Sequence, residues 1–264
     1  MESTGIFRGK KVRYRIKGKG RTIVLLHGFL ESMDIWNVFS DDLSDHFSVV
    51  CIDLPGFGKS EVFESIHTMD LMADIVNKVL NALEVKKCVM VGHSLGGYVA
   101  LSFAEKYAGK LKGLVLFHSH ALADTPEGKM NRDRLINIVE SGHTDFIKEF
   151  IPGLFAPENR EKFAKKIGKL RSAASKTPVE GITAALEGMK RRTDKRDVLE
   201  NAGFPVLFIA GKKDSRIPLD LLLDQVVKPG HAEMLLLANV GHMGFIESRK
   251  HTLKAIKGFA GRIW

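Results

Sequence analysis

The sequence predicts an α/β protein with a mostly parallel sheet that carries helices on both faces. Short apolar runs alternate along the chain with longer segments of helical periodicity. The runs are continuously apolar, which is typical of strands buried on both faces. The composition agrees, because 44% apolar and 27% charged residues are usual for a folded domain. The length of 264 residues favours one large domain, or one domain with an insertion.

The expected elements follow from this alternation in chain order. Continuous apolar runs predict buried strands at residues 22–26, 48–53, 87–91, 111–117, 205–210 and 234–237. A polar, alternating run at Lys11–Ile16 predicts a strand at an antiparallel edge of the sheet. Apolar pairs four residues apart predict a helix over residues 68–83 with Thr68 as its N-cap. Further helices are expected over residues 94–107 and from about Phe245.

Residues 120–204 break the alternation, because they are helical in pattern without a clear strand between the helices. Within them, Thr177, Pro178 and Glu180 have the spacing of a capping box with proline at the first helical position. We therefore expect a core formed by residues 1–119 and 205–264. A helical cap of residues 120–204 is inserted after the sixth strand and lies over one rim of the sheet.

The net charge of +9 raises the question of an anionic partner. Many of the cations fall at helical spacing between Lys129 and Arg196, which predicts a solvated helix face. The alternative is that the cations of the cap bind an acidic carrier protein or a substrate carboxylate. Neither zinc-finger spacing nor a basic-aromatic RNA motif occurs, so no nucleic-acid partner is expected.

Cys51 and Cys88 lie in apolar runs, which predicts buried, reduced thiols. With no long apolar run and no signal segment, we expect a cytoplasmic protein without a membrane partner.

The candidate nucleophile is Ser94, in the Gly-x-Ser-x-Gly pattern of residues 92–96. The pattern follows a predicted strand and precedes a predicted helix, and this context is the one that the motif requires. A turn this tight leaves no room for side chains at its two glycines. It presents the hydroxyl at a helix N-terminus, where backbone amides favour developing negative charge.

A serine needs a base and an orienting acid to become a strong nucleophile. His242 follows the last predicted strand, where a loop reaches the same rim of the sheet, and is the candidate base. Asp214 follows the strand before it and is the candidate acid. Asp220 is a weaker choice, and Asp124 is a rival because some related arrangements place the acid after the preceding strand. The oxyanion requires two further donors, for which we expect the backbone amides of Leu95 and Phe29.

Two other patterns are weaker. Gly58-Lys59-Ser60 resembles the end of a phosphate-binding loop, but the first glycine of that loop would fall at Asp53. The pair His118 and His120 has no acid at the spacing of a metallohydrolase site, so we expect no metal there.

Taken together, the motifs resemble those of the α/β-hydrolase superfamily, in order and over essentially the whole chain. They are His27-Gly28-Phe29, Asp53-Leu54-Pro55-Gly56-Phe57-Gly58-Lys59-Ser60, residues 92–97, Gly211-Lys212-Lys213-Asp214 and Gly241-His242. The resemblance implies an eight-stranded, mostly parallel sheet with a helical cap and a triad of Ser94, Asp214 and His242. It is strongest to carboxylesterases, including methyl esterases of pimeloyl-carrier conjugates, and to enol-lactonases.

We therefore expect a serine hydrolase that cleaves an ester or lactone through an acyl-serine intermediate, without a cofactor. A carbon–carbon bond hydrolase or perhydrolase on the same triad, or a receptor-like binding protein with low turnover, are the alternatives. The cap phenylalanines predict an apolar acyl site or, alternatively, only the packing of the cap onto the sheet. The pocket candidates are His118, His120, Phe146, Phe150, Leu154, Phe155 and Met243.

Overall fold

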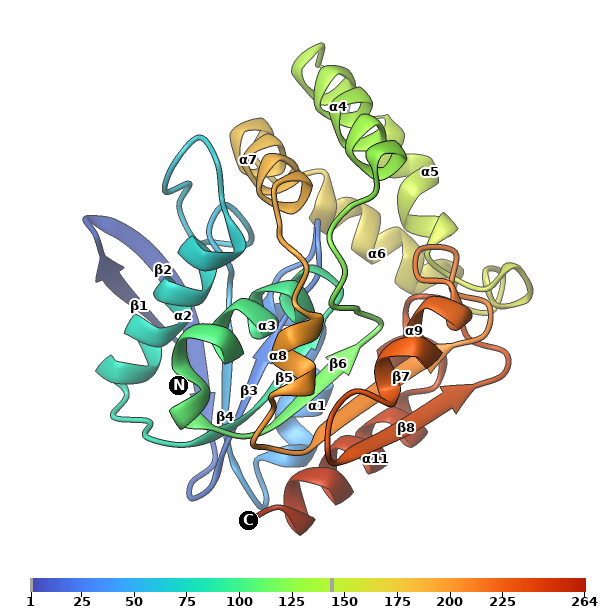
Figure 1. The fold of residues 1–264 in the computed structure, drawn as a ribbon. Coiled ribbons are helices and arrows are strands. Elements are labelled where there is room, and N and C mark those ends of the chain that lie inside the picture. The colour runs from blue at the N-terminus through green and yellow to red at the C-terminus, as the bar shows by residue number, and fades with distance from the viewer. Residues whose placement is uncertain (1, 143–144) are drawn as a thin grey trace.

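The protein is described here by a computed structural model, which covers residues 2–142 and 145–264. An eight-stranded sheet has the order β1-β2-β4-β3-β5-β6-β7-β8 (Figure 1). The strands are β1 (Glu2–Phe7), β2 (Lys10–Lys17), β3 (Thr22–Leu26), β4 (Ser48–Ile52), β5 (Cys88–His93), β6 (Leu111–Phe117), β7 (Val206–Gly211) and β8 (Ala232–Leu237). From β4 to β8 across the sheet every pairing is parallel, which confirms the predicted fold class.

One expectation about the sheet is wrong. The predicted edge strand is β2, which does pair antiparallel with β4, but β1 pairs with its other side and forms the edge instead. The segment Glu2–Phe7 is short and exposed or half-buried at every position. It therefore lacks the apolar run by which a buried strand is recognised in a sequence.

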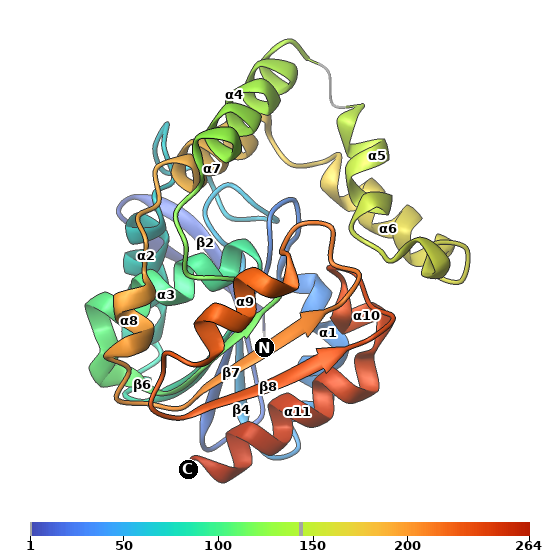
Figure 2. The ribbon, with the colours of Figure 1, turned by 45° about the vertical axis from the view of Figure 1, so that its right-hand side comes forward.

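Helices cover both faces of the sheet. In Figures 1 and 2, α2, α3, α8 and α9 lie on one face and α1 and α11 on the other. The helices are α1 (Asn37–Leu43), α2 (Met69–Ala82), α3 (Leu95–Tyr107), α4 (Pro126–Glu140), α5 (Phe146–Gly153), α6 (Ala164–Ala174), α7 (Val179–Lys190), α8 (Arg196–Glu200), α9 (Leu219–Val226), α10 (Gly244–Glu247) and α11 (Arg249–Arg262).

Helix α2 begins where the sequence predicts. The Thr68 hydroxyl oxygen accepts a hydrogen bond from the Leu71 amide at 3.1 Å and so satisfies one of the amides that a helix start leaves unpaired. The predicted stripe, which includes Ile75 and Val79, is fully buried against the core. Capping and amphipathic periodicity together define this helix, and both are properties of its local sequence.

Helices α4 to α7 lie beyond the carboxyl ends of the parallel strands (Figure 2). Helix α7 touches the core through its backbone: a Cβ atom at Gly181 would lie 2.3 Å from the Gly56 carbonyl oxygen, and one at Gly188 would lie 1.7 Å from that of His67. Helix α8 differs from the others, because it lies beside α3 on the sheet (Figure 1). The predicted insertion, residues 120–204, thus includes α8, a helix that covers the sheet.

The predicted capping box at residues 177–180 is not formed. Helix α7 starts at Val179, its N-cap is Pro178, and no side chain caps it. The Thr177 amide donates to the Ala174 carbonyl oxygen at 3.0 Å, so Thr177 still belongs to the turn that closes α6. Thr177 is therefore part of the end of α6 and does not cap the start of α7.

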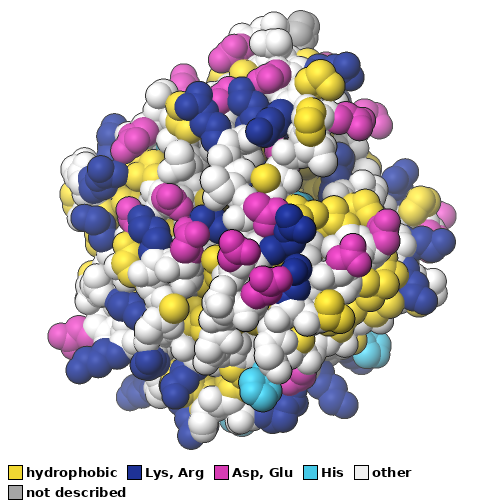
Figure 3. Space-filling view, viewed as in Figure 1, with side chains coloured by type: hydrophobic (Ala, Val, Ile, Leu, Met, Phe, Trp, Pro, Cys, Tyr) yellow, Lys and Arg dark blue, Asp and Glu magenta, His cyan; other side chains and the backbone are white. Residues whose placement is uncertain are grey.

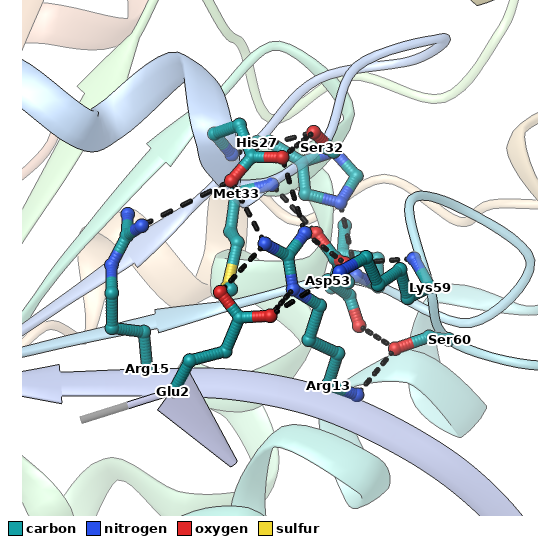
Figure 4. Close-up of polar contacts among 11 residues, drawn as sticks. Glu2, Arg13, Arg15, His27, Ser32, Met33, Asp53, Lys59 and Ser60 are labelled. Atoms are coloured by element: carbon teal, nitrogen blue, oxygen red, sulfur yellow. Dashed lines mark hydrogen bonds and ion pairs between the residues drawn. The ribbon is translucent and has the colours of Figure 1, made fainter. Parts of the chain in front are cut away.

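A buried polar cluster joins β2, β4 and the loop after β3 (Figure 4). The fully buried Asp53 carboxylate accepts hydrogen bonds from Arg13, from the Met33 amide and from the Lys59 amide. The Ser60 hydroxyl donates to the Asp53 carbonyl oxygen. The residues that resemble a phosphate-binding loop are therefore engaged with Asp53, and they brace the loop that approaches the carboxyl edge of the sheet.

Basic and acidic side chains are interleaved on the face seen in Figure 3, with no single basic stripe. Cys51 and Cys88 are free and buried, as predicted. Among the described residues, no helix combines the length and the apolar character needed to cross a membrane.

Candidate active site

Ser94 lies at the sharp turn between β5 and α3. Its backbone has φ of +49°, a left-handed conformation that a non-glycine residue adopts only where its surroundings impose it. The flanking glycines are required by space. A Cβ at Gly92 would lie 2.3 Å from the Gly96 carbonyl oxygen, and one at Gly96 would lie 2.6 Å from that of Leu26. The half-buried Ser94 side chain opens into a cavity above the sheet.

Asp214 and His242, from the loops after β7 and β8, form a hydrogen-bonded pair. The His242 Nδ1 atom lies 2.8 Å from Asp214 Oδ2 and 3.0 Å from Oδ1. The amides of Arg216 and Ile217 donate to the same carboxylate at 2.8 and 3.1 Å. Burial alone would raise the pKa of Asp214. The electrostatic interaction with His242 and the hydrogen bonds from His118 and His242 outweigh burial and hold this pKa well below its usual range, so the group is an anion.

The other acid candidates are placed differently. Asp124 is held by ion pairs to Arg132 at 3.1 Å and Arg192 at 2.7 Å. Asp220 is exposed in the first turn of α9. Of the three aspartates, Asp214 is the one that contacts His242.

Ser94 and His242 line the same cavity, of 660 Å³. Over the described residues 2–142 and 145–264, no hydrogen bond joins the serine hydroxyl to the imidazole. Bonds of this kind are often long or misaligned without substrate and tighten in the reacting complex. The structure thus brings the three predicted groups to one edge of the sheet, with the base and acid paired and the hydroxyl unengaged by the base.

His118 is a second histidine on Asp214, and the sequence did not predict this contact. Its Nδ1 lies 2.9 Å from Asp214 Oδ2, and its Nε2 accepts a hydrogen bond from the Gly244 amide at 3.3 Å. Burial lowers the pKa of His118 to about 4, so the ring is neutral at pH 7. Because Nε2 is an acceptor, the proton is on Nδ1 and points at the carboxylate. His118, Asp214 and His242 lie as close together as the ligands of a metal site, and here both rings are hydrogen-bonded to the carboxylate.

The loop after β3 contains Phe29, whose amide is the second predicted oxyanion donor. Phe29 lines the cavity, and the next residue, Leu30, has a positive φ of +59°, which turns the chain sharply there. The buried His27 ring braces this loop, because Nε2 accepts from the Leu54 amide at 2.9 Å and Nδ1 then donates to the Gly28 carbonyl oxygen at 2.8 Å. Leu95 starts α3, so its amide is among those that the helix leaves unpaired.

A buried pair of His93 and Glu31 links three parts of the site. The His93 Nδ1 atom lies 2.9 Å from Glu31 Oε2, and its Nε2 lies 3.0 Å from the His242 carbonyl oxygen. Glu31 Oε2 also accepts from the Gly28 amide at 2.6 Å. Both His93 nitrogens face acceptors, so the ring is an imidazolium. Burial alone would lower the pKa of His93, but Glu31 outweighs burial and raises it.

The pocket predictions divide in two. His120, Phe146, Phe150 and Leu154 line the cavity, while the fully buried His118, Phe155 and Met243 lie outside that lining. Phe155 instead packs against the Phe163 ring, with centroids 6.2 Å apart, and so contributes to packing within the insertion. His118, Phe155 and Met243 were predicted to line the pocket, and their side chains are instead buried against other parts of the protein.

Sequence reasoning missed Glu31, His93 and Arg216, which also surround the site. The one available signal for His93 was its place beside the nucleophile, where any residue type fits the motif. Glu31 and Arg216 lie in loops without a motif of their own.

The comparisons with known proteins agree with the fold. A family model described as the alpha/beta hydrolase fold matches residues 21–248, and the chain belongs to that family. A thermophilic esterase from Thermogutta terrifontis, solved with malate bound, has 30% identity and a TM-score of 0.93, with 100% of this chain and 99% of that chain covered. The enol-lactonase from Burkholderia xenovorans LB400 has 21% identity and a TM-score of 0.91, with 98% and 100% covered. An esterase from Exiguobacterium antarcticum has 20% identity and a TM-score of 0.89, with 99% and 100% covered.

Proposed function

We propose that the protein is a serine hydrolase that cleaves carboxylic esters or lactones through an acyl-serine intermediate. The observation that carries the proposal is the convergence of Ser94, the His242–Asp214 pair and Phe29 on one cavity. The family and the esterase and enol-lactonase neighbours support the same class of reaction.

The roles follow from the contacts. His242 takes the proton of Ser94 as the hydroxyl attacks the carbonyl carbon, and Asp214 orients the imidazole and stabilises the imidazolium that forms. The amides of Phe29 and Leu95 donate to the oxyanion. His242 then protonates the leaving alkoxide, and a water molecule that it activates releases the acid. His118 acts through Asp214, because its Nδ1 proton occupies one carboxylate oxygen and limits the rotation of the carboxylate.

The direct test is the Ser94→Ala variant with a 4-nitrophenyl ester. We expect turnover to fall by about 10⁵- to 10⁶-fold, since a triad acts as a unit. The matched control is Ser175→Ala, which removes an exposed hydroxyl at the end of α6. Equal activity of the Ser94 variant and the parent, with both proteins folded, would show that the mechanism is wrong.

Carbon–carbon bond cleavage and perhydrolysis remain alternatives on the same residues. Mass spectrometry of the protein with an ester distinguishes them, because an acyl group on Ser94 supports ester or lactone hydrolysis. Turnover of vinylogous diketones alone would favour carbon–carbon cleavage, and a tightly bound ligand with negligible turnover would favour a receptor.

The docking of an acidic carrier protein on the insertion is a separate proposal. A groove between α6 and α11 is edged by cations, and its apolar side chains include Phe163 and Leu170. The cations are Lys162, Lys166, Lys169, Arg249 and Lys250. We expect the KM of a carrier-linked ester, but not of a small neutral ester, to rise strongly with salt, because screening weakens such contacts. Equal salt dependence of the two substrates would remove this proposal.

A further inference from the structure

The active-site cavity carries more positive than negative charge. Its lining includes four arginines and three carboxylates: Arg132, Arg134, Arg192 and Arg216, with Glu31, Asp124 and Glu149. Glu31 is neutralised by His93, as described above. Arg134 and Glu149 are exposed. Arg216 is exposed as well. Among the described lining residues, Asp124 is thus the one further carboxylate for the half-buried Arg132, the buried Arg192 and the solvent-exposed Arg216.

Asp124 is already shared by two of these groups. Arg192 pairs with it at 2.7 Å, lies 4.2 Å from the Tyr98 ring centroid and donates to two carbonyl oxygens. Arg132 contacts the same carboxylate through Nε at 3.1 Å. These contacts fix Arg192 as part of the cavity wall. They leave Asp124 with no capacity to neutralise a third cation.

Arg216 is the third cation, and no ion pair holds its side chain within the ranges 2–142 and 145–264. Its guanidinium carbon lies 4.6 Å from the centroid of the Phe150 ring, which supports one face of the group. The nearest acid in sequence, Asp214, is occupied by two histidines and two amides. Burial lowers the pKa of Arg216 although the side chain keeps contact with solvent. The negative charge of Asp214 opposes this shift, and the positive charge of Arg132, a smaller effect, acts in the same direction as burial. Two guanidinium groups thus repel each other across the cavity.

We propose that the substrate carries a carboxylate in addition to its ester or lactone group, and that Arg216 binds this carboxylate inside the cavity. This inference rests on the proposed function and names its substrate class. A guanidinium presents parallel N–H groups that match the two oxygens of a carboxylate. A ring beneath Arg216 restricts its movement, so less entropy is lost when the anion binds. An anion there also relieves the repulsion between Arg216 and Arg132.

A purely structural role for Arg216 makes a different prediction. If its stacking on Phe150 served only to fasten α5 to the core, loss of the side chain would affect every substrate alike. A carboxylate-binding role instead affects anionic substrates selectively. The two roles are therefore separated by a ratio of rates rather than by a single activity.

The experiment compares kcat/KM for two matched pairs of esters at low salt. The first pair, 4-nitrophenyl hydrogen adipate and 4-nitrophenyl heptanoate, places the charge on the acyl side. The second, 4-(butanoyloxy)benzoate and 4-methylphenyl butanoate, places it on the alcohol side. The proteins are the parent, Arg216→Gln, Arg216→Lys and, as a control at the cavity mouth, Arg134→Gln.

We expect Arg216→Gln to lower the anionic-to-neutral ratio about 10- to 100-fold for one of the two pairs, the loss of a charged hydrogen bond. Arg216→Lys should restore part of the ratio, and Arg134→Gln should change it by less than about threefold. The inference is overturned if Arg216→Gln leaves both ratios unchanged, or if the parent accepts only the neutral ester of each pair. Both results leave the hydrolase function intact, because turnover of neutral esters and its loss in Ser94→Ala test that function separately.

Discussion

The buried pair of Glu31 and His93 allows a prediction with a defined magnitude. The two side chains are 2% and 1% exposed, and the substitution Glu31→Gln removes the negative charge while keeping the shape. His93 must then lose its proton or remain a buried cation without a charged partner, and in either state the ion pair is lost. Breaking a buried ion pair costs about 3–5 kcal/mol. Because His93 can release its proton, we expect the free energy of unfolding of Glu31→Gln to fall by about 2–4 kcal/mol. This is a large part of the roughly 5–15 kcal/mol typical of a whole domain.

The assay is equilibrium unfolding in urea at pH 6, followed by tryptophan fluorescence, with refolding checked. The control is Asp41→Asn, which removes an exposed ion pair with Lys17 whose side chains are 63% and 47% exposed. Such a pair is worth at most about 1 kcal/mol. If the free energy of unfolding of Glu31→Gln falls no further than that of the control, His93 is not charged in the folded protein.

The same pair predicts a pH dependence. Burial would raise the pKa of Glu31, but the charge of His93 and the hydrogen bonds outweigh burial and lower it from 4.5. The contribution of Glu31 to the stability of the fold is present above pH 4.5. It is lost as the pH falls through the lower pKa that Glu31 has in the folded protein. The pKa of His93 is raised from 6.5, so its contribution is complete below pH 6.5 and is lost as the pH rises through the folded value. The stability difference between the parent and Glu31→Gln should therefore be largest between pH 4.5 and 6.5 and decrease in alkali.

Three further predictions concern other parts of the chain. His118→Asn should lower kcat about tenfold with KM within about twofold of the parent, because it weakens one hydrogen bond to Asp214 and leaves the cavity lining unchanged; a change confined to KM contradicts this role. Gly188→Ala should lower the melting temperature, since its Cβ would lie 1.7 Å from the His67 carbonyl oxygen, and calorimetry that shows no change would mean that α7 is loosely docked. Both cysteines should resist iodoacetamide at pH 7.5 until the protein unfolds, because burial raises their pKa values to about 11 and 12; rapid labelling of the native protein would show that they are accessible.

The parts of the site that sequence reasoning identified are those specified by adjacent residues. Gly92 and Gly96 are needed because the backbone of the sharp turn at Ser94 and the backbone of β3 occupy the space that side chains would fill. The Thr68 cap likewise needs only a hydroxyl and the amide three residues later. The positions of Asp214 and His242 follow from one further rule, that loops after parallel strands meet at the same edge of a sheet.

The sequence by itself therefore determined the parallel part of the sheet, the sharp turn at Ser94 and the order of the candidate reacting groups, since each depends on periodicity or on neighbours within a few residues. Only the tertiary structure decided which partners the remaining polar groups have. His118 meets Asp214 from another strand, His93 meets Glu31 across the site, and Arg216 lies over Phe150 of the insertion. The physical reason is that charge and hydrogen bonding act between atoms that are close in space. A residue such as Arg216, ordinary in its own loop, acquires a role only when distant chain segments pack around it.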